Sequence, residues 1–171
     1  MKNLVFLNGT MGAGKSTVAR QLRDLLAPAV YLDGDWCWDM QPFVVNDETK
    51  AMVMDNIAFL LNRFLRCTAC DTVVFCWVMH QQAIVDELLA RLERKSVRFS
   101  LFTLTLSEQA LIRRLRRDIE AGLRSEDVLA RSCARLPLYE TMDSVKIDVS
   151  QISAQEAAAQ IAALVRAAET G

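Results

Sequence analysis

Long apolar runs, which mark membrane proteins and exported proteins, are absent from this chain of 171 residues. No apolar run approaches the 18 or more residues that a membrane helix requires. The apolar run 4–7 near the N-terminus is too short for the core of a signal peptide. We therefore expect a cytoplasmic protein that makes no membrane contact.

Proline, glycine and excess charge are also scarce. Three prolines, six glycines and the absence of repeats or low-complexity segments predict one domain over residues 1–171. A net charge of -1 argues against a nucleic-acid partner, which requires a basic surface. Five cysteines, an odd number, predict free thiols in a reducing compartment. Cys67 and Cys70 have C-x-x-C spacing, but no second pair completes a zinc site.

What the chain does contain is a regular alternation of apolar runs and segments with helical periodicity. Strands are expected at 2–8, 30–32, 72–79, 97–106 and 145–149. Helices are expected at 15–27, 47–66, 82–95, 108–121 and 126–135, and a last helix begins at a capping box made by Ser153 and Glu156. This alternation predicts an α/β fold whose parallel sheet is covered on both faces. Ligands of such sheets bind beyond the carboxyl ends of the strands.

A glycine-rich segment follows the first expected strand directly. It reads G-T-M-G-A-G-K-S from Gly9 to Ser16, which is the G-x-x-x-x-G-K-[ST] pattern of a P-loop. Backbone N–H groups of such a loop surround phosphates, Lys15 neutralises their charge, and the Ser16 hydroxyl binds Mg²⁺. The nucleotide-binding residues are therefore expected to be Gly9, Thr10, Met11, Gly12, Ala13, Gly14, Lys15, Ser16 and Thr17.

The next question is which class of P-loop protein this is. The N-K-x-D and D-x-x-G motifs of a small GTPase are missing, and the third expected strand ends without an acidic residue. Asp33-Gly34-Asp35 instead follows the second strand. If the chain stays extended there, both carboxylates point the same way. One could then hold Mg²⁺ or take a proton, and the other could hydrogen-bond a substrate hydroxyl.

The P-loop and this Asp-x-Asp together resemble the shikimate kinase and gluconate kinase group of small-molecule kinases. The Asp-Gly-Asp form is most similar to gluconate kinases and adenylylsulfate kinases. The resemblance implies a three-layer P-loop fold with strand order 2-3-1-4-5 and a mobile lid. It assigns Mg²⁺ binding and catalysis to Asp33 and acceptor binding to Asp35. The whole chain resembles bacterial proteins grouped as nucleotide kinases or AAA-type ATPases.

Two departures from that family limit what the resemblance implies about the acceptor. Shikimate kinases have a triple-glycine motif after strand three, where this chain has residues 76–80, CWVMH. Residues 36–39, WCWD, match no acceptor segment of gluconate kinases. Shikimate is therefore not expected to be the acceptor, and the acceptor of the family does not transfer to this chain.

An arginine-rich segment at about 108–137 occupies the position of the lid in P-loop kinases. Arginines can neutralise the γ-phosphate during transfer, which raises rates by about 10³–10⁵. We expect Arg117, Arg124 and Arg131 to serve catalysis. The alternative is a solvated cationic face whose arginines pair with acids such as Asp118.

Two further residues are candidates for acceptor binding. Trp36 adjoins Asp35 and could offer a flat wall to a sugar or base, although a structural role fits equally. His80 is the only histidine, and we place it at the carboxyl end of the third strand, where acceptors bind. It could be a substrate ligand or a general base, or a structural residue.

These observations predict a kinase. ATP and Mg²⁺ are the expected cofactors, and the partner is a small-molecule acceptor: a sugar acid, a nucleoside or nucleotide, or an antibiotic hydroxyl. A monomer or homodimer is expected. The alternative is a regulatory ATPase or switch that acts on a protein partner.

Overall fold

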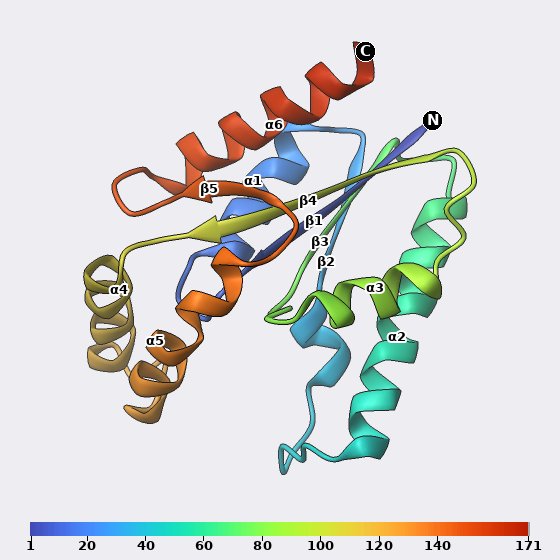
Figure 1. The fold of residues 1–171 in the computed structure, drawn as a ribbon. Coiled ribbons are helices and arrows are strands. Elements are labelled where there is room, and N and C mark those ends of the chain that lie inside the picture. Colours follow the sequence, from blue (N-terminus) through green and yellow to red (C-terminus); the bar gives the residue numbers. More distant parts are fainter. Residues whose placement is uncertain (171) are drawn as a thin grey trace.

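The computed structural model describes residues 1–170 and places a parallel sheet between layers of helices (Figure 1). The strands are β1 (Lys2–Gly9), β2 (Ala29–Asp33), β3 (Thr72–Cys76), β4 (Val97–Thr105) and β5 (Val145–Asp148). The helices are α1 (Lys15–Leu25), the 3₁₀ helix η1 (Gly34–Trp38), α2 (Asp47–Arg66), α3 (Gln82–Ala90), α4 (Glu108–Glu120), α5 (Asp127–Glu140) and α6 (Ala154–Thr170). The strand order is β2-β3-β1-β4-β5, which confirms the predicted α/β fold and its order.

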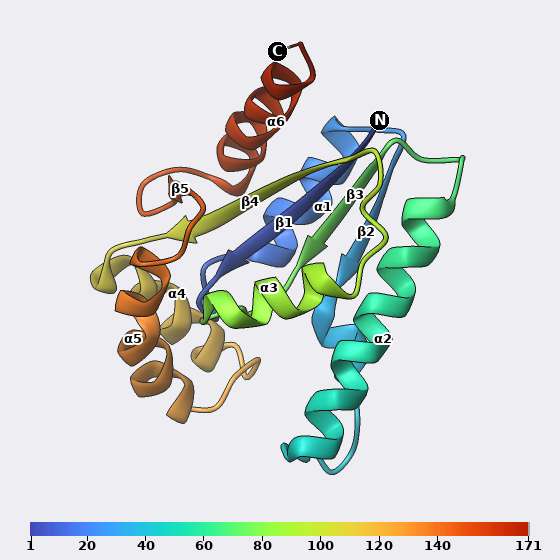
Figure 2. The ribbon, with the colours of Figure 1, turned by 45° about the vertical axis from the view of Figure 1, so that its right-hand side comes forward.

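Helices cover both faces of the sheet, with α1 and α6 on one side and α2 and α3 on the other (Figure 2). The central strand β1 is buried almost throughout. Its residues alternate between the two faces: Val5 packs in the cluster under α1 and α6, and Phe6 packs in the cluster under α2 and α3. Burial on both faces explains why the strand reads as a continuous apolar run.

Strand register brings the phosphate loop, the Asp-x-Asp and the end of β3 to one edge of the sheet. Leu7 of β1 lies opposite Cys76 of β3, and Cys76 lies opposite Asp33 of β2. The three strands therefore finish together, and the segments that follow them converge. The lid helices α4 and α5 lie beside the same edge (Figure 1).

β3 ends at Cys76 rather than at residue 79. The Asn8 side chain takes over the hydrogen bonds of Met79: its Nδ2 donates to the Met79 carbonyl oxygen at 2.7 Å, and the Met79 N–H donates to Asn8 Oδ1 at 2.9 Å. The Trp77 N–H still donates to the Leu7 carbonyl oxygen at 3.3 Å, and at Met79 the Asn8 side chain replaces the backbone partner. As a result, His80 lies in the β3–α3 connection and not at the end of a strand.

Other element boundaries also differ from expectation. The chain after Asp33 does not stay extended but turns at once into η1, whose N-cap is Asp33. α1 and α3 end earlier than expected, at Leu25 and Ala90, and α5 runs on to Glu140 with Pro137 inside it.

Several local predictions are confirmed. α2 spans the predicted residues, and Ser153 and Glu156 form the expected capping box, with the Glu156 N–H donating to Ser153 Oγ at 3.2 Å. All five cysteines of the described chain are free thiols. Among residues 1–170, no helix has the length and apolar character needed to cross a membrane.

Candidate active site

The phosphate loop leaves β1 and enters α1 through two glycines with left-handed backbone conformations. Gly9 has φ +144°, and a Cβ atom there would lie 2.8 Å from the Leu104 carbonyl oxygen, so a larger residue does not fit. Gly14 is the N-cap of α1 with φ +91°, and within residues 1–170 no side chain caps this helix. The first N–H groups of α1 are therefore left for a phosphate.

One cleft of about 440 Å³ gathers most of the predicted site residues. It is lined by Met11, Gly12, Ala13, Gly14, Lys15, Ser16, Thr17, Val18, Asp33, Asp35, Trp77, Val78, Arg114, Arg117, Asp118, Arg124, Val149, Ile152, Ser153 and Ala154. Gly9 and Thr10 are buried behind it, where the Thr10 hydroxyl donates to the Ser132 carbonyl oxygen at 3.3 Å. The cleft is thus open at the carboxyl edge of the sheet, where ligands of parallel sheets bind.

Lys15 lies in this cleft at the start of α1. Its Nζ donates a hydrogen bond of 3.0 Å to the Thr10 carbonyl oxygen. Burial lowers the pKa of Lys15 and outweighs the nearby acidic groups, which include Asp35. A phosphate oxygen beside Nζ would replace the water that burial removes, so the site favours an anionic ligand.

Asp33 is the centre of a hydrogen-bond network at the end of β2. Its Oδ2 accepts hydrogen bonds of 2.7 Å from both the Ser16 hydroxyl and the Tyr31 hydroxyl. Its Oδ1 accepts the Asp35 backbone N–H at 3.1 Å. The Cys76 thiol lies 3.3 Å from the Tyr31 hydroxyl, and burial raises the pKa of this thiol to about 12. Cys76 is therefore a neutral structural neighbour at pH 7.

Ser16 and Asp33 suit Mg²⁺ chemically, because a hydroxyl and a carboxylate supply hard oxygen donors at one point. No group of three or more His, Cys, Asp or Glu side chains gathers anywhere in residues 1–170 to hold a metal alone. Mg²⁺ in nucleotide sites is held through one or two carboxylates together with substrate phosphates, so these residues fit that ion.

Asp35 belongs to η1 and faces the same cleft. Partial burial and the neighbouring Asp33 carboxylate raise its pKa, and the positive charge of Lys15 opposes the rise. Trp77 packs directly against Gly34, where an added Cβ would lie 2.4 Å from its Cγ. The indole thus fixes the start of η1 and the position of Asp35.

The lid arginines divide into two groups. Arg117 and Arg124 line the cleft, and Arg124 Nε lies 3.1 Å from an Asp118 carboxylate oxygen. Arg131 pairs with Asp127 at 3.2 Å and is exposed, outside the cleft lining within the described chain. The structure therefore brings two of the three predicted arginines to the site.

Arg114 is a cleft residue to which the sequence assigned no individual role. Its Nη1 donates to the Ala13 carbonyl oxygen at 3.0 Å, and its Nη2 donates to the Val149 carbonyl oxygen. Burial and the neighbouring arginines lower its pKa. Trp77, Val78 and Asp118 also line the cleft, although the sequence did not indicate them as site residues. The helical spacing from Leu111 to Leu115 separates a buried from an exposed side, but it does not tell Arg114 from its neighbours.

Trp36 and His80 lie apart from the cleft lining of the described residues. Trp36 is 57% exposed, packs edge-on against Tyr31 with ring centroids 5.2 Å apart, and lines a second groove. His80 Nδ1 is buried without a hydrogen-bond partner among residues 1–170, and burial together with Arg135 lowers the pKa of His80.

Solved structures of two kinases and of an antibiotic-resistance protein share this fold. Shikimate kinase from Acinetobacter baumannii, solved with shikimate, is 23% identical, with 100% of this chain and 97% of that chain covered and a TM-score of 0.68. A gluconokinase from Sinorhizobium meliloti 1021 is 18% identical, with 96% and 95% covered and a TM-score of 0.65. The tunicamycin resistance protein of Deinococcus radiodurans is 19% identical, with 96% of each chain covered and a TM-score of 0.68.

The comparison with curated proteins found no match. Residues 5–131, most of the chain, match the AAA_18 family, described as an AAA domain. This span contains the phosphate loop, the Asp-x-Asp and the first lid helix. The chain therefore has the fold of the P-loop kinases and belongs to the AAA_18 family of AAA domains.

Proposed function

We propose that this protein is a kinase that transfers the γ-phosphate of ATP, with Mg²⁺, to a hydroxyl group of a small molecule. One observation carries the proposal: a single cleft joins the phosphate loop to Asp33, Asp35 and the lid arginines. A phosphate-binding loop alone fits any nucleotide-binding protein. The two carboxylates opposite it supply what an acceptor alcohol needs.

In this reaction the acceptor oxygen attacks the γ-phosphorus, the bond to the β–γ bridging oxygen breaks, and ADP leaves. The hydroxyl proton must go to a base. Asp35 is the better candidate, because both oxygens of Asp33 already accept hydrogen bonds, whereas Asp35 faces the cleft with a raised pKa. We therefore move the proton-accepting role, which the sequence favoured for Asp33, to Asp35.

The remaining groups divide between the metal and the phosphates. Ser16 and Asp33 are proposed to hold Mg²⁺, which neutralises charge on the phosphates. Lys15 binds the β- and γ-phosphates. Arg117 and Arg124 contact the transferred group when the lid, at about 108–137, closes over the cleft. The lid and the rest of residues 1–171 are proposed to form a single domain. Shikimate kinase and gluconokinase, by their names, act on small molecules, which supports an acceptor of that kind.

The test is ADP release from ATP and Mg²⁺ across sugar acids, nucleosides, nucleotides and hydroxylated antibiotics, with Lys15→Ala as the blank. A compound that stimulates release well above background, and forms a phosphorylated product, supports the kinase. Slow hydrolysis that no small molecule stimulates would contradict it. That result would support a regulatory switch, the alternative favoured by the exposed apolar side chains of residues 36–59.

A further inference from the structure

The outer face of α2 carries exposed side chains along most of the length of the helix. Its inner face is buried, as Val53, Ile57 and Leu61 show. The opposite face carries Glu48, Met52, Asn56, Phe59 and Arg63, all of them exposed. We call these residues the α2 stripe. Residues three and four positions apart lie on one side of a helix, so their side chains form one continuous surface.

Much of this surface is apolar, although it faces solvent. α2 lies at the outer edge of the molecule in both ribbon views (Figure 1, Figure 2), and the outer face of a surface helix is ordinarily polar. Met52 and Phe59 are nevertheless 39% and 65% exposed. Together with the exposed Trp36 they line a groove of about 510 Å³ between η1 and α2. Apolar side chains that gather in this way mark an interaction surface, whereas isolated ones do not.

The order of the side chains in the α2 stripe is self-complementary. The acidic Glu48 begins the stripe and the basic Arg63 ends it. Met52 follows the acid at the same spacing at which Phe59 precedes the base. When two copies of α2 lie antiparallel about a twofold axis, each Glu48 therefore faces Arg63 of the second copy, and Met52 faces Phe59. A parallel arrangement would instead bring like charges together.

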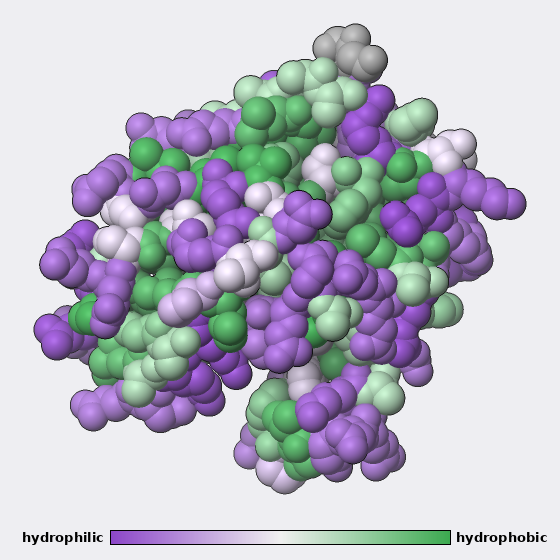
Figure 3. Space-filling view, viewed as in Figure 1, coloured by the Kyte–Doolittle hydropathy of each residue, from purple (hydrophilic) through white to green (hydrophobic). Residues whose placement is uncertain are grey.

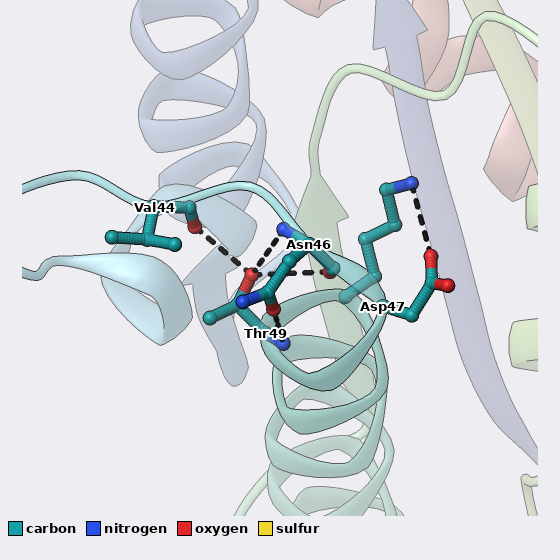
Figure 4. A network of polar contacts seen from close by, with 5 residues as sticks. Val44, Asn46, Asp47 and Thr49 are labelled. Carbon is teal, nitrogen blue, oxygen red and sulfur yellow. Dashed lines mark hydrogen bonds and ion pairs between the residues drawn. The ribbon is translucent and has the colours of Figure 1, made fainter.

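Both charges of the stripe are available for such pairs. Within residues 1–170, neither Glu48 nor Arg63 has an ion-pair partner. The other charged residues of α2 are already paired: Asp47 with Lys50 at 3.6 Å (Figure 4), Asp55 with Arg91, and Arg66 with Glu93. The unpaired charges of the helix are therefore the two that an antiparallel second copy would bring together.

The helix and the loop before it are held in place without a partner. Asn46 and Thr49 form a reciprocal capping box, and the Thr49 hydroxyl also donates to the Val44 carbonyl oxygen at 2.9 Å (Figure 4). Hydrophobic surface is visible on the lobe that this segment forms below the body of the molecule, where η1 leads into α2 (Figure 3). A surface that is ordered beforehand loses little conformational entropy on association.

We infer that the protein forms a homodimer in which the α2 stripes of two copies pack antiparallel. Because Phe59 of the second copy faces Met52, its ring enters the groove that Met52 lines, and the twofold axis repeats this contact. The self-complementary order favours a second copy over a different protein, which would need no such order. The dimer does not depend on the proposed kinase function.

Sedimentation velocity of the full chain at a series of concentrations tests the dimer. The wild type is expected to show a monomer–dimer equilibrium with a Kd of roughly micromolar size, because the interface is centred on one helix. Phe59→Asp should raise this Kd by roughly tenfold or more, since it acts at both symmetric contacts. Met52→Gln keeps a good helix former and should weaken the dimer in the same direction. The matched control is Leu164→Asp, on the exposed face of α6, which should leave the Kd unchanged.

Two charge reversals test the antiparallel register. Glu48→Arg alone and Arg63→Glu alone each place like charges at both ends of the interface, so each should raise the Kd by roughly tenfold. In a mixture of the two variants every end joins opposite charges again, and dimerisation should recover. Lys95→Glu, at an exposed position, matches the charge change of Arg63→Glu and should have no effect.

Three results would overturn the inference. One is a chain that stays monomeric up to about 1 mM, where even weak complexes form. Another is a dimer that Phe59→Asp leaves intact, because that dimer uses a different surface. The third is a mixture of the two charge variants that does not recover dimerisation, because the stripes then do not pack antiparallel. Circular dichroism of each variant checks that the fold is retained, as expected for substitutions at exposed positions.

Discussion

The Ser16 hydroxyl donates a hydrogen bond of 2.7 Å to Asp33 Oδ2. This contact joins the first turn of α1 to the end of β2, so the phosphate loop and the Asp-x-Asp form one unit. It also explains why we propose different roles for the two aspartates, Mg²⁺ binding for Asp33 and proton acceptance for Asp35. Asp33 is buried and both its oxygens accept hydrogen bonds, whereas Asp35, in the first turn of η1, lines the cleft and is left to meet the acceptor.

Lys15→Ala is expected to abolish ATP turnover and to leave the fold intact. The lysine contacts the protein through the Thr10 carbonyl oxygen, and burial already disfavours its charge, so its removal costs little stability. Turnover and melting temperature measured together test this. Lys95→Ala, at an exposed position, is the control that should change neither. Full turnover in Lys15→Ala would refute the assignment of the phosphate loop.

Asp35→Asn should lower kcat by roughly 10²–10⁴, the usual contribution of a general base, while ATP affinity changes little. Asp33→Asn should instead weaken the binding of Mg²⁺, because the Asp33 oxygens are the proposed metal ligands. More Mg²⁺ should then be needed to reach half-maximal activity. Steady-state kinetics at several Mg²⁺ concentrations separate the two effects. If both variants lose activity through ATP binding alone, the proposed division of roles is wrong.

The raised pKa of Asp35 has a consequence for stability. The folded state holds the Asp35 proton more tightly than the unfolded state does, so stability is lost as the pH rises above the ordinary aspartate value of about 3.8. Asp35→Asn removes this penalty. The variant should therefore be more stable than the wild type at pH 7, and the difference should vanish below pH 3. Urea unfolding at both pH values measures it, and an equal effect at both would contradict the shift.

Arg114→Ala should destabilise the protein and weaken nucleotide binding. Its guanidinium connects α4 to the carbonyl oxygens of Ala13 and Val149, on either side of the proposed nucleotide site. Loss of these bonds is expected to cost about 1–3 kcal/mol. Chemical denaturation and ATP titration check both effects. Arg113→Ala, exposed on the same helix, should leave stability within about 0.5 kcal/mol.

The parts of the fold that local chemistry determines were predictable. α2 spans the residues that its apolar periodicity predicted, and the phosphate loop follows from a contiguous motif. β3 was predicted too long because its apolar run continues past Cys76. In the folded protein Met79 bonds to the Asn8 side chain instead of to a strand backbone, a tertiary contact that the local sequence does not indicate.

The site was predictable where its residues lie close together in the sequence. Lys15, Ser16, Asp33 and Asp35 reach one cleft as expected. Trp36 does not join them, because η1 rotates it away from Asp35, and an extended chain was assumed at that point. The positions of Arg114 and Trp77 in the site depend on packing between elements that are distant in the sequence. No local sequence pattern indicates such packing.

Gly34→Ala tests whether Trp77 positions the Asp-x-Asp. The new Cβ would lie 2.4 Å from Trp77 Cγ and 2.5 Å from Cδ1, so the indole must move, at a cost of about 1–3 kcal/mol. kcat should fall as well, because Trp77 packs against Gly34, the residue directly before Asp35. In a Trp77→Gly background the same substitution meets neither the indole nor the Trp77 Cβ, which would lie 2.9 Å away, and it should cost much less. Urea unfolding of the two single variants and the double variant gives the coupling free energy. Additive effects would mean that Gly34 is needed for its backbone, and that Trp77 does not hold Asp35 in place.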